Sequence, residues 1–170
     1  MTVKQDIPAQ VIHEIDKVAD EILNGLGSID EKKINLVPFE GSWTAAQVIV
    51  HVTKSNNGLI RYFQETGTIP SREPDSGVET LKKIFLDFAT KLKSPDFIVP
   101  EALKYNKHEI VSKLRQSFED VLSAARECNL TDEVNHFIFK SITKVELAHF
   151  IVYHTQRHIH QLKKIKKALE

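Results

Sequence analysis

The stretch from Thr143 to Lys167 constrains the fold of this chain more than any other, because its apolar residues fall on or beside one face of a helix. His154 and His158 occupy two positions of that apolar face, one helical turn apart. A polar group without a partner is costly to bury, so both imidazoles need one. The partner is either the backbone or water, as for ordinary core histidines, or a metal ion that both rings reach. The apolar positions of the face are Leu147, Phe150, Ile151, Leu162 and Ile165.

Similar periodicity elsewhere predicts an all-α fold. We expect five helices, near residues 6–26, 43–66, 77–92, 106–128 and 143–167, separated by stretches rich in glycine, proline and other turn formers. No segment alternates with period two for long enough to predict a sheet. Residues 97–100 are expected to form an extended connector, and residues 135–139 an apolar loop against the helices. We therefore predict that residues 1–170 form one helical bundle domain.

The second predicted helix has a sharply defined start. Thr44 and Gln47 form a capping-box pattern, which recurs with Thr143 and Glu146 at the last helix. His51 follows in the second turn, at the edge of an apolar stripe. Ser55 and Gly58 share its face. Because these side chains are small, the sequence predicts room for a cavity beside His51.

Charge and composition exclude several classes of function. The chain has 23 basic and 23 acidic residues, so no overall positive field argues for nucleic acid as a partner. The lysine-rich end of the last helix is better explained by the helix dipole. No apolar run approaches the ~20 residues that span a bilayer, and the amino terminus lacks a signal-peptide pattern. Cys128 is the only cysteine. We therefore expect a cytoplasmic protein that binds neither membrane nor nucleic acid.

Two short motifs together resemble a known family. Trp43-Thr44 precedes His51 by less than three turns, and the last helix reads His154-x-x-Arg157-His158-x-x-Gln161. This arrangement resembles the DinB-like superfamily, also called YfiT-like metal-dependent hydrolases, and its ending is similar to that of the DinB_2 branch. Many members have His-Pro-Phe where this chain has His136-Phe137, so the usual proline is missing here.

The resemblance implies a four-helix bundle of up-down-down-up order with one extra shorter helix, often assembled as a homodimer. It implies a divalent metal ion held by His51, His154 and His158, with zinc, nickel or iron all compatible with imidazole ligands. Three neutral imidazoles leave the ion an open position, which is typical of catalytic sites. Since protons compete with the ion, we expect metal affinity to fall as the pH drops through about 6.5.

The resemblance also implies a choice of reactions on a small-molecule substrate. Some relatives are thiol-dependent transferases that use bacillithiol, mycothiol or glutathione, so either hydrolysis or transfer from a thiol cosubstrate is expected. The alternative is a non-catalytic, stress-associated bundle whose metal only stabilises the fold. The sequence names no catalytic residue beyond a weak candidate, Tyr62.

Other polar residues of the last helix have open roles. Arg157 could meet a carboxylate of another helix or an anionic substrate, and Gln161, on the histidine face, could contact a ligand or the substrate. His149 and His160 lie away from that face and should not be ligands, with His160 exposed. His136 and His108 are expected to be ordinary loop and helix-start residues.

Overall fold

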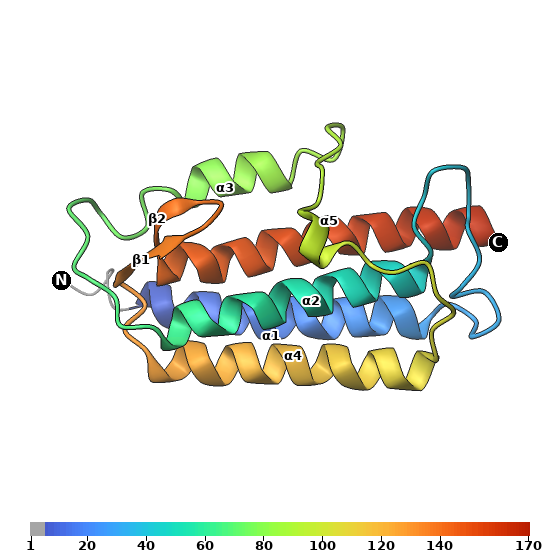
Figure 1. Cartoon of the computed structure of the whole chain (residues 1–170), viewed down its shortest axis with the longest axis horizontal. Helices are drawn as coiled ribbons and strands as arrows, with labels where there is room; N and C mark the ends of the chain where they lie inside the picture. The colour runs from blue at the N-terminus through green and yellow to red at the C-terminus, as the bar shows by residue number, and fades with distance from the viewer. Residues whose placement is uncertain (1–5) are drawn as a thin grey trace.

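The computed structural model describes residues 6–170 and shows a bundle of four long helices with a short helix and a small hairpin against it (Figure 1). The long helices are α1 (Asp6–Gly27), α2 (Ala45–Gln64), α4 (Lys107–Glu127) and α5 (Lys144–Leu169). Each begins and ends within two residues of its predicted bounds, which confirms the all-α prediction.

The order of the helices is up-down-down-up. In Figure 1, α1 and α5 run in one direction and α2 and α4 in the other. Helices α1 and α2 each pack against both α4 and α5. A long connection from α2 to α4 passes α5 and carries the short helix α3 (Val78–Phe85) and the 3-10 turn η1 (Asp96–Ile98). The predicted fold class is therefore confirmed, and α2 and α5, which carry the three candidate histidines, are neighbours.

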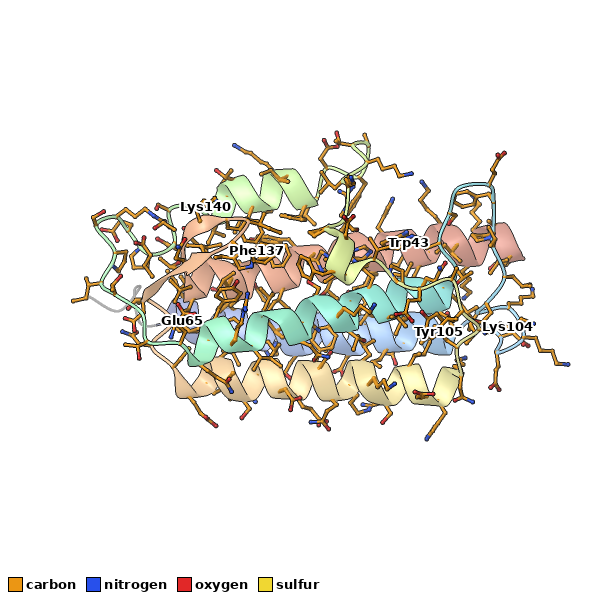
Figure 2. All side chains as sticks on the ribbon, viewed as in Figure 1. Trp43, Glu65, Lys104, Tyr105, Phe137 and Lys140 are labelled. Atoms are coloured by element: carbon orange, nitrogen blue, oxygen red, sulfur yellow. The ribbon has the colours of Figure 1, made fainter. Side chains whose placement is uncertain are left out.

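Apolar side chains of the four long helices fill the space between them (Figure 2). The capping box predicted at α2 is present: Thr44 Oγ1 accepts from the Gln47 amide at 3.1 Å, and Gln47 Oε1 accepts from the Thr44 amide at 2.9 Å. The cap satisfies backbone donors that the first helical turn leaves free. It thereby fixes where α2 starts and on which face His51 lies.

The third helix is shorter than predicted, because it ends at Phe85 instead of residue 92. The Asp87 carboxylate accepts from the Ala89 amide at 3.1 Å and the Thr90 hydroxyl at 2.6 Å, a turn that competes with helical hydrogen bonding. Arg157 of α5 donates to the carbonyl oxygens of Phe85 and Asp87, at 3.2 and 2.8 Å, and to that of Thr90. Because Arg157 binds these carbonyls, they are not used to continue α3, and residues 86–92 form a loop against α5.

Two further predictions about loops were wrong. Residues 96–98 form η1 instead of an extended connector. The segment around residues 135–139, predicted as a loop, lies within an antiparallel hairpin of β1 (Glu133–His136) and β2 (Lys140–Thr143). Its register pairs His136 with Lys140, whose φ of 60° closes a three-residue turn. Strands of four residues are too short to show clear period-two alternation in a sequence.

A closed polar network fixes the start of α5. Glu146 is 2 % exposed and completes the capping box with Thr143. Its carboxylate also accepts from both terminal nitrogens of Arg72, at 2.5 and 2.7 Å, and from the Gly77 amide at 2.7 Å. A side chain at position 77 would collide with that carboxylate, since a Cβ there would lie 2.5 Å from Glu146 Oε1. The loop before α3 is therefore held against α5.

Within residues 6–170, no helix has both the length and the apolar character needed to cross a membrane.

Candidate metal centre

Two neighbouring helices bring the three predicted histidines together. His51 comes from the second turn of α2, and His154 and His158 from consecutive turns of α5. Their side chains are 2 %, 6 % and 7 % exposed, so all three are buried. Trp43 lies against the His51 ring, with centroids 5.0 Å apart, and Phe150 stacks on His154 at 5.1 Å. Aromatic walls therefore fix the orientation of the imidazoles from outside the cluster.

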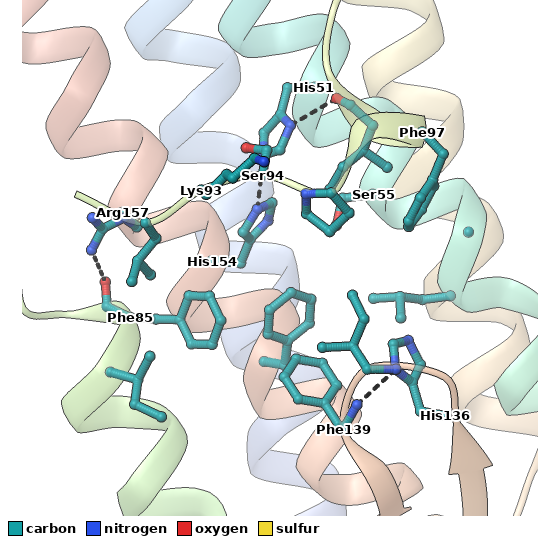
Figure 3. A pocket seen from close by; sticks show the side chains of 18 of the residues that line it. His51, Ser55, Phe85, Lys93, Ser94, Phe97, His136, Phe139, His154 and Arg157 are labelled. Carbon is teal, nitrogen blue, oxygen red and sulfur yellow. Dashed lines mark hydrogen bonds between the residues drawn. The ribbon is translucent and has the colours of Figure 1, made fainter. Parts of the chain in front are cut away.

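The Nε2 atoms of the three histidines converge on one point. His154 Nε2 lies 3.1 Å from His51 Nε2 and 3.2 Å from His158 Nε2 (Figure 3 shows the His51–His154 contact). One ligand atom from each residue falls within 4.8 Å of the other two. Two nitrogens bound to a tetrahedral zinc ion at 2.0–2.1 Å lie about 3.3 Å apart. The spacing found here is close to that value.

The hydrogen bonds at Nδ1 of His51 and His158 determine that their lone pairs are on Nε2. His51 Nδ1 donates to the Ile98 carbonyl at 2.9 Å, and His158 Nδ1 donates to Gln161 Oε1 at 2.8 Å. A neutral imidazole has one proton, so Nε2 of both residues presents a lone pair to His154 Nε2. His154 Nε2 can donate to only one of them. A cation at the shared point would accept all the lone pairs, and the donor set fits a divalent metal ion.

All three histidines are neutral at pH 7. Burial lowers the pKa of His158 to about 3, with repulsion from His51 adding to the effect. Burial, together with repulsion from His158 and His51, holds the pKa of His154 well below its usual value. Burial also lowers the pKa of His51, although its bond to Ile98 opposes the shift. Since the pKa of each ligand is lowered, protons should compete with a metal ion at a lower pH than the reference histidine value of about 6.5 suggests.

Comparison with known proteins agrees with this architecture. The sequence model of the DinB superfamily matches residues 14–162. The chain belongs to the DinB superfamily. It is 22 % identical over 157 residues to the uncharacterized protein YuaE of Bacillus subtilis, covering 88 % of this chain and 93 % of YuaE.

A solved structure shares the fold of this DinB-superfamily chain. It is YfiT from Bacillus subtilis, described as a probable metal-dependent hydrolase with an unusual four-helix bundle topology. The two structures align with a TM-score of 0.66 over 95 % of this chain and 87 % of YfiT, at 13 % sequence identity. At that identity, the likeness is evidence for the fold.

In this DinB-superfamily chain, the histidine cluster opens onto a cavity of about 290 Å³. The lining is mainly apolar, and none of the described residues that form it is an aspartate or glutamate. Ser55 and Gly58 line it beside His51, which agrees with the space predicted from their size. Figure 3 shows the phenylalanine side chains that surround the cavity. The apolar lining residues are Leu59, Ile84, Phe85, Leu92, Phe97, Ile98, Phe137, Ile138, Phe139 and Phe150.

A second cavity, of about 590 Å³, reaches the cluster from another side. The two cavities share the segment Leu92–Ser94 together with Arg157 and His158. The second one is more polar and carries an excess of positive charge, with Asp96 as its one carboxylate among the described residues. Its basic side chains are Lys91, Lys93, Arg157 and Lys164, with His160 beside them. Two cavities of different character thus meet at His158.

The polar neighbours on α5 take specific roles. Arg157 forms no ion pair with a helix carboxylate among the described residues; it binds the three backbone carbonyls after α3, and its charge helps to lower the pKa of the Asp87 carboxyl. Gln161 does contact the cluster, through His158. His160 is half-buried instead of exposed, because it stacks on Phe88 at 4.1 Å. His149 lies apart from the cluster, with its Nδ1 3.9 Å from Glu14 Oε2.

Sequence reasoning missed His136 and overvalued Tyr62. His136 is 4 % exposed and lines the apolar cavity. The Tyr62 hydroxyl accepts from Arg61 at 2.6 Å, and Tyr62 is not one of the lining residues. A signal for His136 did exist. It stands in an apolar run, where a buried polar side chain must find a partner.

Proposed function

We propose that this protein is a metal-dependent enzyme that acts on a small molecule at His51, His154 and His158. The observation that carries the proposal is the convergence of three buried, neutral imidazoles whose Nε2 lone pairs meet at 3.1–3.2 Å beside a cavity. The description of YfiT as a probable metal-dependent hydrolase supports it. Zinc, nickel and iron(II) all suit this ligand set.

Each part of the site has a task in such a reaction. The Ile98 carbonyl and Gln161 hold the proton of His51 and His158 on Nδ1, so that Nε2 stays available as a ligand. The apolar cavity would hold the body of the substrate and exclude bulk water. When bound, a divalent ion with three imidazole ligands supplies a Lewis acid that lowers the pKa of water or of a thiol.

Hydrolysis and thiol transfer are both compatible with this site, and one observation gives specific support to thiol transfer. Hydrolysis needs one organic substrate and water, whereas thiol transfer needs two organic molecules. The apolar cavity and the basic cavity meet at His158, so an electrophile could occupy the first and an anionic thiol cosubstrate the second. We therefore include thiol transfer as the second candidate.

The test is an activity screen of the full chain loaded in turn with zinc, nickel and iron(II). Small neutral esters report hydrolysis, and a chromogenic electrophile offered with bacillithiol or glutathione reports thiol transfer. Metal-dependent turnover should disappear in His51→Ala and persist in His149→Ala, whose histidine lies on α5 outside the cluster. Equal turnover in wild type and His51→Ala would refute the proposal. Metal binding without any turnover would favour the non-catalytic alternative.

A further inference from the structure

His136 places a buried polar group in the apolar cavity, away from the histidine cluster. It is the last residue of β1, it is 4 % exposed and it lines the cavity. Figure 3 shows it near Phe139 and away from His51 and His154. The reaction described above gives it no task.

The hairpin fixes the tautomer of His136. Its Nδ1 accepts from the backbone amides of Ile138 and Phe139, at 3.1 and 3.2 Å. A nitrogen that accepts from N–H groups carries no proton of its own, so the proton of the neutral ring is on Nε2. No described residue accepts a hydrogen bond from that Nε2–H. The cavity therefore contains a donor whose partner the protein does not provide.

The surroundings of His136 keep it neutral. Burial, with a smaller contribution from the positive charge of Arg61, lowers its pKa to about 4. Three aromatic rings pack around the imidazole. The distances from its ring centroid to theirs are 4.5 Å for Tyr62, 4.7 Å for Phe137 and 4.9 Å for Phe139. A protonated ring would lose both bonds at Nδ1. At neutral pH, His136 thus acts as a fixed N–H donor.

We propose that His136 Nε2–H binds an uncharged oxygen acceptor, such as a carbonyl, on a small and otherwise apolar substrate. The bond would position the substrate with its other end toward His51, His154 and His158. That the bound substrate then reacts rests on the proposed function, whereas its binding to His136 does not need a metal. An anionic acceptor at His136 fits this cavity poorly, because a charge would lose its water among phenylalanines and the basic lining residues Lys93 and Arg157 lie toward the histidine cluster (Figure 3).

The test compares two probes that differ in one group, acetophenone and 2-phenylpropene. The second replaces the carbonyl oxygen with a methylene of similar shape. Dissociation constants are measured by NMR titration of the full-length chain, both zinc-loaded and treated with chelator. One neutral hydrogen bond should favour acetophenone about fivefold to tenfold in both samples. The Nε2–H resonance of His136 should shift with acetophenone and not with 2-phenylpropene.

The decisive variant is His136→Asn. An asparagine oxygen can still accept from the amides two and three residues later, so the hairpin turn keeps its bonds, and the shorter asparagine N–H2 group does not reach the place of Nε2–H. The preference for acetophenone should disappear, and 2-phenylpropene should bind as before. His13→Asn, at an exposed position of α1, is the matched control and should keep the preference. Circular dichroism checks that both variants fold.

Three outcomes would overturn the inference. A preference that appears only with zinc would assign the oxygen to the metal. A preference that survives in His136→Asn would assign the oxygen to a donor other than His136. Equal binding of both probes to wild type would assign His136 a structural role in the hairpin alone. If zinc does not bind but the preference persists in the chelated chain, the proposed function fails and the role of His136 stands.

Discussion

Helix α5 buries polar side chains at its start and again near its middle, and the two groups differ in what satisfies them. At the start, Glu146 has partners from three other residues, and the Lys144 ammonium donates to the carbonyls of Phe63 and Glu65 at 3.0 and 2.6 Å. In the middle, the Nε2 atoms of His154 and His158 have, among residues 6–170, hydrogen-bond contacts only with other imidazole nitrogens. The first group is complete within the protein, and the second leaves lone pairs that a cation could accept.

The comparison separates two uses of buried polarity. The network at the start of α5, in which every group has a partner, has a structural role. It holds the loop of Arg72 and the end of α2 against α5. A cluster of lone pairs beside a cavity costs stability unless a ligand compensates it. Residues of both kinds interrupt apolar stripes in the same way in the sequence. Their partners in space distinguish a structural network from a binding site.

The largest effect is expected at the first region. Replacing Glu146 with alanine leaves the Arg72 guanidinium without its main partner and removes the half of the α5 capping box in which Glu146 accepts from the Thr143 amide. We expect a loss of about 3 kcal/mol in the free energy of unfolding, measured with urea. The control is Glu109→Ala, whose exposed pair with Lys113 should contribute less than about 1 kcal/mol. Similar losses in the two variants would contradict the assignment of a structural network.

The starts of the long helices follow from local sequence, which explains why they were predictable. Thr44 and Gln47 cap α2, and Thr143 and Glu146 cap α5, each within four residues. The end of α3 depends instead on Arg157, which is 72 residues from Phe85 in the chain. No local pattern around residue 85 could show that contact.

The candidate site was predictable to a similar extent. The spacing of His154 and His158 is a local property of one helix, whereas the contribution of His51 came from the family resemblance. The hydrogen bond from His51 to Ile98 spans 47 residues and depends on η1, which the sequence did not indicate. His136 escaped notice because strands of four residues show little periodicity.

A smaller effect, on pH dependence, should distinguish the two regions. Burial lowers the pKa of His136 to about 4 and of His158 to about 3, so the folded chain binds fewer protons than the unfolded chain below the reference value of about 6.5. Stability of the metal-free chain should be complete above that pH and fall as the pH falls toward the folded values. For Glu146, burial raises the pKa but its hydrogen bonds outweigh burial, so the net pKa is lowered and its contribution is lost only below about 4.5.

Urea unfolding of the metal-free chain at pH 8, 6 and 5 measures this difference. The free energy of unfolding should already decline between pH 6 and 5, before Glu146 is protonated. His158→Leu should make the decline shallower, because it removes one buried histidine. Equal stability at pH 8 and pH 5 would show that the histidines are not held neutral by the fold.

The smallest effect is expected at Arg157. Arg157→Met removes the donors that bind the carbonyls of Phe85, Asp87 and Thr90, so the loop of residues 86–92 should open more often. We expect a loss of about 1 kcal/mol, seen as faster hydrogen exchange confined to that loop. Arg126→Met, which removes an exposed pair with Asp16, should leave that exchange unchanged. An equal effect of both variants would exclude a specific role for Arg157.

Calorimetric unfolding with and without zinc tests the central claim most directly, that the three histidines bind one ion which folding does not require. A chain of 170 residues can bury enough apolar surface to fold alone, so metal-free wild type should melt cooperatively. Zinc at a hundred times its dissociation constant should add about 2.7 kcal/mol to the free energy of unfolding. His51→Ala should melt cooperatively without responding to zinc, and His149→Ala should respond as wild type does. A metal-free chain without a cooperative transition, or a His51→Ala variant that zinc stabilises as much as wild type, would contradict the claim.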